Sequence, residues 1–207
     1  MVIAIDGPAG TGKSTVARAV AERLGFTYLD TGAMYRAVAL AADRTGRPAA
    51  EVAEHIDIEL GERVLVAGED VTEAIRTPEI TAATSHVAAD PDVREALVRR
   101  QQEIVADGDW VAEGRDIGTV VAPNAAVKVF LTATAEERAR RRAAQTGGDY
   151  ATILKDQAER DARDSTADRA IFEAPDDSVP VDTTELTLDE VIDQIATLVI
   201  EAKEIGA

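Results

Sequence analysis

Short apolar runs alternate with helical repeats along the 207-residue chain. The run over residues 2–5 predicts a buried strand, and Val16, Val20 and Leu24 follow it at the spacing of one helix face. Gly25 stands where that helix is expected to end. Four further short runs predict strands, at residues 26–29, 110–113, 127–131 and 179–181. Strands that alternate with helices in this way are typical of a parallel α/β sheet.

The polar residues of the sequence predict where several helices begin and end. A helix is expected over about residues 32–43, after the second strand. Two later helices begin with a capping-box pattern, in which a hydroxyl and a glutamate three residues later bond each other's backbone N–H groups. The pairs are Thr134 with Glu137 and Thr187 with Glu190, and the second of these helices is expected to close the chain at about residue 205.

The alternation breaks between residues 37 and 105. Two short alternating runs, at residues 56–60 and 63–66, meet at Gly61 and Glu62 and predict a small hairpin, which two helical stretches follow. We interpret residues 37–105 as an inserted subdomain that carries a second substrate.

The segment that joins the first strand to the first helix reads GPAGTGKST. Its pattern, Gly7-x-x-x-x-Gly12-Lys13-Ser14, predicts a phosphate-binding P-loop, because backbone N–H groups and the positive end of a helix meet there. Lys13 is expected to reach the terminal phosphates of a nucleoside triphosphate, and Ser14 to place its hydroxyl on Mg²⁺. A Gly-rich turn before an amphipathic helix, with no ligand, is the alternative. The residues expected to bind the nucleoside triphosphate are Gly7, Pro8, Ala9, Gly10, Thr11, Gly12, Lys13, Ser14 and Thr15.

The expected fold class is therefore α/β, a P-loop NTPase-type parallel sheet flanked by helices, with an inserted nucleotide-binding subdomain and a mobile lid. The core comprises residues 1–36 and 106–207. The lid is expected at about residues 145–175, where paired glycines are followed by arginines.

The composition limits which classes of molecule the protein is expected to bind. The chain has a formal net charge of −17, which disfavours nucleic acid, and no apolar run near the roughly 20 residues that a membrane span needs. It contains no cysteine, which excludes disulfides and thiolate metal sites. We expect a cytoplasmic monomer with small-molecule nucleotide partners. Arginine accounts for 18 of the 22 basic residues, and its planar fork suits phosphate, although Arg138, Arg140, Arg141 and Arg142 fit an ordinary helix surface equally well.

Three polar clusters supply the positioning and positive charge that phosphoryl transfer requires. They lie at residues 30–36, at residues 113–119 and at residues 160–166. Glu113 directly follows an apolar strand, which suits a carboxylate that holds the water shell of Mg²⁺.

Six segments together resemble bacterial cytidylate kinases over nearly the whole chain. In order they are GPAGTGKST, LDTGAMYR, VREALVRRQ, EGRDIGT, VKVFLTATAEERARRR and RDARDST. The resemblance implies a nucleoside monophosphate kinase that moves the γ-phosphoryl group of ATP to CMP or dCMP with Mg²⁺. It implies Lys13, Arg115, Arg160 and Arg163 as catalytic residues. The substrate-binding residues that it implies are Thr31, Tyr35, Arg36, Ser85, Arg94, Arg115, Asp116, Arg160 and Asp164.

Within that set, Tyr35, Arg36, Arg115 and Arg160 match residues that hold the acceptor phosphate. Ser85, Arg94 and Asp116 match residues that read cytosine, and Asp164 matches a sugar-binding aspartate. Arg163 matches a lid arginine near the transferred phosphoryl group. After Thr166 the chain departs from the family pattern, because Ala167 and Asp168 intervene before Arg169. Asp116 has a second interpretation, in which it orients Arg115 or Arg94 through a salt bridge.

The sequence bears differently on two other possible functions. A GTP-dependent switch would select guanine with Asn-Lys-x-Asp, but none of the lysines, Lys13, Lys128, Lys155 and Lys203, follows an asparagine. A P-loop kinase with another acceptor, such as UMP, AMP or shikimate, stays open. The two histidines, His55 and His86, are not at metal-ligand spacing and are assigned to the surface or to packing.

Overall fold

The computed structural model describes residues 1–165 and 174–205, of which residues 163–165 and 205 are described by their backbone only. The chain forms two compact units. The first contains residues 1–28 and 108–207, and the second contains residues 29–107. The second unit overlaps the subdomain expected at residues 37–105.

A five-stranded sheet carries the first unit, and its strand order is β2-β6-β1-β7-β8. The strands are β1 (Val2–Asp6), β2 (Thr27–Asp30), β6 (Trp110–Glu113), β7 (Val127–Thr132) and β8 (Val179–Asp182). β1 pairs in parallel with β6 and β7, and β7 pairs in parallel with β8. Ile5 lies opposite Glu113, so the residues that follow β1 and β6 emerge at the same edge of the sheet. The parallel α/β class and all five predicted strands are confirmed.

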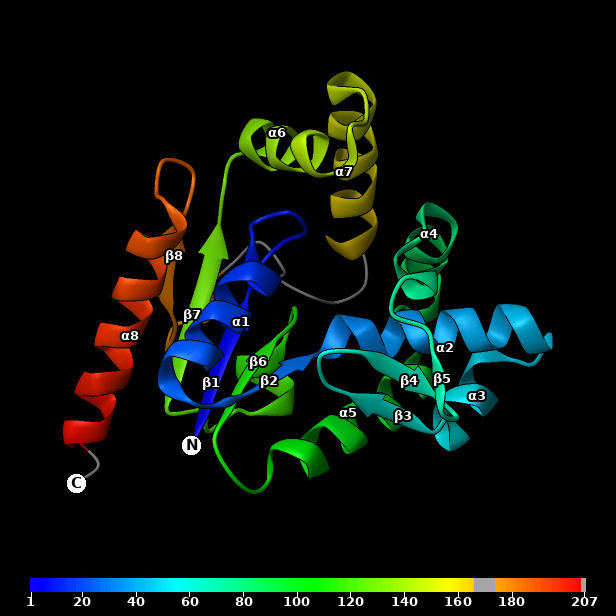
Figure 1. Cartoon of the computed structure of the whole chain (residues 1–207), viewed down its shortest axis with the longest axis horizontal. Coiled ribbons are helices and arrows are strands. Elements are labelled where there is room, and N and C mark those ends of the chain that lie inside the picture. Colours follow the sequence, from blue (N-terminus) through cyan, green and yellow to red (C-terminus); the bar gives the residue numbers. More distant parts are fainter. Residues whose placement is uncertain (166–173, 206–207) are drawn as a thin grey trace. The chain divides into compact units, whose positions relative to one another are not determined.

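Helices α1 (Lys13–Leu24) and α8 (Leu188–Ile205) pack together against this sheet. Buried aliphatic side chains of β1, β7, α1 and α8 form one core cluster, in which Ile3, Val20 and Ile195 are fully buried. Figure 1 shows α8 running along the β8 side of the sheet. α1 ends as expected at Gly25, which adopts a left-handed conformation and donates its N–H to the carbonyls of Ala21 and Glu22.

The two expected capping boxes differ in outcome. Before α8, the Glu190 N–H donates to Thr187 Oγ1 (3.3 Å) and the Thr187 N–H donates to Glu190 Oε2 (2.8 Å), so that box is confirmed. Before α6 (Ala135–Thr146), only the bond from the Glu137 N–H to Thr134 Oγ1 is formed. The Glu137 carboxylate instead accepts from the guanidinium groups of Arg140 and Arg141, because hydrogen bonds between charged groups are the stronger ones.

The segment expected as an irregular lid contains the end of α6 and a further helix, α7 (Tyr150–Ser165). α6 and α7 pack against each other, and Figure 1 shows them as a pair beyond the end of β7.

The second unit is built around α2 (Thr31–Thr45), which packs against several of the unit's other helices. The predicted hairpin is confirmed, since β3 (Ile58–Leu60) and β4 (Val64–Val66) are antiparallel with Leu60 opposite Val64. A third strand, β5 (Glu69–Asp70), was not predicted because two residues carry no alternating pattern. The remaining elements are α3 (Ala49–His55), η1 (Ala74–Arg76), α4 (Pro78–Val87) and α5 (Pro91–Val105).

None of the helices within residues 1–165 and 174–205 is both long enough and apolar enough to cross a lipid bilayer.

Candidate active site

The loop between β1 and α1 is fixed against the sheet at its first residue. Gly7 has a φ of +144°, and a Cβ there would lie 2.1 Å from the Leu131 carbonyl oxygen of β7. Only glycine therefore fits at this position. Gly10, further along the loop, has a φ of +81° and lies close to Arg138 of α6 and Gln157 of α7.

Four cationic side chains donate hydrogen bonds to carbonyl oxygens of this loop. Arg115 Nη1 bonds Gly7 O (3.1 Å), and Lys13 Nζ bonds Pro8 O (2.8 Å). Two arginines of α6 continue the series, with Arg138 Nη1 on Ala9 O (2.9 Å) and Arg141 Nη1 on Thr11 O (3.3 Å). The loop is thus held by positive charge along its length. For Arg138 and Arg141 the ordinary-surface interpretation is wrong, whereas Arg140 and Arg142 are exposed.

Lys13 lies among other charged groups of the first unit. Burial and the neighbouring Arg115 guanidinium lower the pKa of Lys13 to about 7, with a further lowering by Arg160. Glu113 and Asp6 act in the opposite direction on that pKa. Cations held together in this way create a positive potential that attracts a polyphosphate.

Asp6, which no sequence motif indicated, is a buried residue of the candidate site. Asp6 is 4% exposed, and its carboxylate accepts the backbone N–H groups of Ile117 (2.8 Å) and Gly118 (2.7 Å). Burial raises the pKa of Asp6 to about 6, although the two N–H groups act in the opposite direction. These bonds fix the segment that directly follows Arg115 and Asp116, which forms the short helical turn η2 (Ile117–Val121). The sequence feature that could have indicated Asp6 is its position as a carboxylate at the end of the apolar first strand.

Glu113 ends β6 with 4% exposure, and the Tyr28 hydroxyl donates to its Oε1 (2.6 Å). The Arg18 guanidinium lies 4.7 Å from the centre of the Tyr28 ring. Among the described residues, no group of three or more His, Cys, Asp and Glu side chains could hold a metal ion. The donor set fits Mg²⁺ that arrives with nucleotide phosphates and keeps most of its waters, because the protein then needs to supply only the exposed Ser14 hydroxyl and the Glu113 carboxylate.

The second unit contains five of the expected substrate-binding residues. Thr31, Tyr35 and Arg36 lie in the first two turns of α2, Ser85 lies on α4 and Arg94 lies on α5. Thr31 is buried and the other four are half-buried.

Arg36 is held by the residue that caps its own helix. Asp30 accepts the Ala33 N–H at the start of α2 (2.8 Å), and its Oδ2 accepts from Arg36 Nη2 (2.9 Å). The Asp30 carboxylate therefore orients the Arg36 guanidinium. The sequence indicated Asp30 only as a member of the polar cluster at residues 30–36.

The arginine cluster at residues 160–166 is described in part. Arg160 is a half-buried residue of α7. Arg163 and Asp164 belong to α7, but their side chains lie outside the described residues, as does the whole of Arg169.

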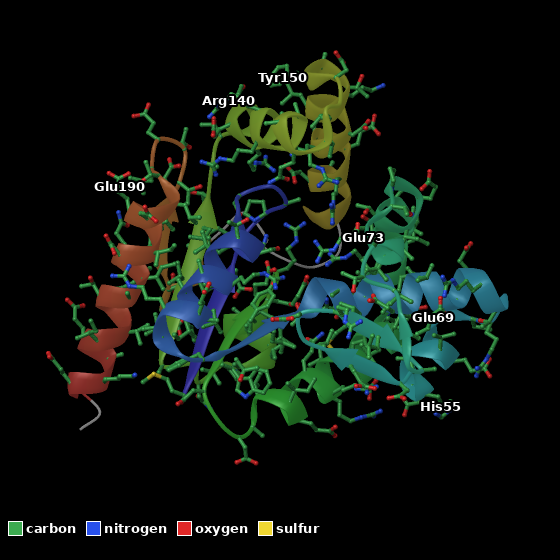
Figure 2. All side chains as sticks on the ribbon, in the orientation of Figure 1. His55, Glu69, Glu73, Arg140, Tyr150 and Glu190 are labelled. Carbon is green, nitrogen blue, oxygen red and sulfur yellow. The ribbon has the colours of Figure 1, made fainter. Side chains whose placement is uncertain are left out.

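Both histidines are exposed, and His55 is marked in Figure 2 at the end of α3.

A parallel sheet whose first strand leads into a glycine-rich, cation-held loop and then a helix defines the class of P-loop NTPase-type proteins. The fold is similar to that of a gluconokinase from Sinorhizobium meliloti 1021, with a TM-score of 0.56 and 19% identity, covering 99% of this chain and 94% of that one. This likeness concerns the fold alone.

The particular family follows from sequence similarity. The family model described as cytidylate kinase matches residues 3–201. Cytidylate kinase of Rhodococcus opacus (strain B4) is 46% identical, covering 100% of this chain and 97% of that protein. Cytidylate kinase of Caldanaerobacter subterraneus subsp. tengcongensis (strain DSM 15242 / JCM 11007 / NBRC 100824 / MB4) is 47% identical, covering 93% and 92% respectively. The chain belongs to the cytidylate kinase family.

Proposed function

We propose that this protein transfers the γ-phosphoryl group of ATP to CMP or dCMP, giving ADP and CDP or dCDP. The observation that carries the proposal is that Lys13 and Arg115 both bond carbonyl oxygens of the glycine-rich loop, with the charge of Arg160 acting on Lys13, in a chain of the cytidylate kinase family. A polyphosphate and its transferring phosphoryl group need such concentrated positive charge, and a chain with a net charge of −17 has to gather it locally.

In the proposed reaction, a phosphate oxygen of CMP forms a bond to the γ-phosphorus of ATP. The bond from that phosphorus to the bridging oxygen breaks, and ADP leaves with the electron pair. Lys13 and Arg115 neutralise the charge that develops on the oxygens, which requires each to exchange its loop carbonyl for phosphate. Arg160 and Arg163 are assigned to the same charge on the basis of the family resemblance.

Mg²⁺ would supply charge neutralisation on the triphosphate. We assign Ser14 and Glu113 to hold it, Ser14 through its hydroxyl and Glu113 through its carboxylate. Tyr28 fixes the rotamer of Glu113 by its hydrogen bond, so the carboxylate is oriented before any ligand binds.

The acceptor assignments also come from the family resemblance. Tyr35, Arg36, Arg115 and Arg160 would bind the CMP phosphate, with Thr31 as a further substrate-binding residue. Ser85, Arg94 and Asp116 would read the base, and Asp164 would bind the sugar. We assign the second unit to the acceptor and about residues 145–175 to a lid over the nucleotides.

One assay tests the proposal. The purified protein is incubated with ATP, Mg²⁺ and one acceptor at a time, from CMP, dCMP, UMP, AMP and shikimate, and ADP formation is followed. We expect turnover with CMP and dCMP well above the other acceptors. Preference for another acceptor would overturn the cytidylate assignment, and ADP formation independent of every acceptor would overturn the transferase.

A further inference from the structure

Arg138 joins two parts of the first unit through one guanidinium group. It lies in the arginine-rich stretch of α6, yet it is only 5% exposed. Its Nη1 donates to Ala9 O of the glycine-rich loop (2.9 Å), and its Nη2 donates to Asp161 Oδ2 of α7 (2.7 Å). The loop and α7 are therefore bonded to the same planar group.

The pair of Arg138 and Asp161 is shielded from water. Their side chains are 6% and 13% exposed, respectively. Removal of either charge would leave the other buried without compensation, which is far more costly than the loss of a surface ion pair. A lysine at position 138 would keep the charge but lack the fork that reaches two acceptors in a fixed geometry.

The packing around Gly10 provides an independent sign that α7 lies on the loop. A Cβ at Gly10 would come within 2.9 Å of Gln157 Nε2 and 3.2 Å of Arg138 Cβ. Gln157 and Asp161 are one helical turn apart, so they share one face of α7. That face approaches the loop at Gly10 and the α6 arginine at Arg138.

Arg160 directly precedes Asp161 on α7, and its charge acts on Lys13. The docking of α7 therefore decides how far the Arg160 guanidinium stands from the Lys13 ammonium. Phosphoryl transfer is sensitive to that placement, because misplacement of a charged group by about 1 Å can cost on the order of 10²-fold in rate.

We infer that Arg138 is a positioning residue for phosphoryl transfer, which holds Ala9 and Asp161 at once and thereby places Arg160 relative to Lys13. The inference rests on the proposed function. Arg138 acts through Arg160 and touches no reacting atom itself.

Paired variants test this role. In Arg138→Lys and Asp161→Asn we expect kcat with CMP to fall at least about tenfold, since both leave Arg160 misplaced. Their matched controls are Arg140→Lys, which changes a 73% exposed arginine of α6, and Asp156→Asn, which changes an exposed aspartate of α7. Figure 2 labels Arg140 on α6. We expect both controls to retain the kcat of the unaltered protein.

A double-mutant cycle separates positioning from a general loss of structure. We expect Arg160→Lys to lower kcat much less in the Arg138→Lys background than in the unaltered protein, because Arg160 is already misplaced there. If the fold-loss of kcat in the double variant equals the product of the losses in the two single variants, the inference is overturned. Equal kcat values for Arg138→Lys and Arg140→Lys would also overturn it. If Arg138→Lys does not fold, the same cycle with Asp161→Asn decides.

Hydrogen exchange measured without nucleotide tests the role of Arg138 independently of the proposed function. We expect amides at residues 150–162 to exchange faster in Arg138→Lys than in Arg140→Lys, and equal rates would overturn the tie between α6 and α7. If the unaltered protein does not phosphorylate CMP, the proposed function is wrong, and the exchange comparison still decides whether Arg138 holds α7.

Discussion

The Tyr28 hydroxyl donates a 2.6 Å hydrogen bond to Glu113 Oε1, so the carboxylate that ends β6 is oriented from the strand beside it. In Tyr28→Phe this donor is lost while the ring remains. Because a residue that orients a metal-binding carboxylate typically contributes 10- to 100-fold to metal affinity or activity, we expect the Mg²⁺ concentration for half-maximal activity to rise on the order of tenfold.

The control for this measurement is Tyr150→Phe, at a tyrosine that is 41% exposed, which we expect to leave the Mg²⁺ dependence unchanged. An unchanged Mg²⁺ dependence in Tyr28→Phe would mean that Tyr28 serves packing alone.

Lys13→Ala removes the cation assigned to the transferring phosphoryl group. We expect kcat to fall by at least roughly 10², because a charge lost from a water-excluded site is not replaced by solvent. The melting temperature should stay near that of the unaltered protein. Lys155→Ala, at a lysine that is 76% exposed, is the control. Near-normal turnover in a folded Lys13→Ala protein would end the P-loop interpretation.

The lowered pKa of Lys13 predicts proton uptake on nucleotide binding. With a pKa of about 7 in the free protein, the amine is largely neutral at pH 8. A bound triphosphate favours the ammonium form, so its pKa rises and binding of Mg²⁺-ATP takes up close to one proton. ATP affinity should therefore fall as pH rises above 7.

Titration calorimetry in buffers with different ionisation enthalpies measures the uptake directly. Lys13→Arg is the control, because its guanidinium stays protonated and its binding should involve no uptake at pH 8. If the unaltered protein takes up no proton at that pH, the pKa of Lys13 is not depressed in solution.

Asp116→Asn tests which residue distinguishes cytosine from uracil. A carboxylate can only accept, which suits the N4 amine of cytosine, whereas an amide can also donate toward the O4 of uracil. We expect the ratio of kcat/KM for CMP over UMP to fall at least about tenfold, equivalent to roughly 1.4 kcal/mol. Equal losses with both substrates would support the salt-bridge role of Asp116 instead.

Asp6 gives the fold a specific pH dependence. Its pKa is raised from 3.8 to about 6, so the native state holds this proton where the unfolded state has released it. The stabilisation from that proton is complete below pH 3.8 and is lost as pH rises through about 6, at roughly 1.4 kcal/mol per unit of pKa difference. The free energy of unfolding, measured with urea between pH 4 and 7, should fall less steeply with rising pH in Asp6→Asn than in the unaltered protein. An equally steep fall in both proteins would contradict the raised pKa of Asp6.

Local signals in the sequence located most of the sheet but only part of the candidate site. The glycine-rich loop and the strand that ends at Glu113 were predictable, because apolar runs and glycine spacing are local. The burial of Arg138 was not, since its partner Ala9 lies 129 residues away and its neighbour Arg140 looks the same in the sequence. The box of Thr134 and Glu137 forms only in part for a related reason, because Arg140 and Arg141 compete with the Thr134 N–H for the Glu137 carboxylate.

The 2.1 Å approach of a residue-7 Cβ to Leu131 O affects how the glycine-rich motif is interpreted in other chains. A side chain at that position would force β1 and β7 apart, whether or not any nucleotide is bound. By contrast, nothing lies within 4 Å of a Cβ at Gly25, where only the backbone conformation disfavours replacement. A relative that had lost its enzymatic role would be free to drift at Lys13 while still retaining glycine at position 7. Presence of that glycine reports an intact sheet, and the lysine is the informative position for activity.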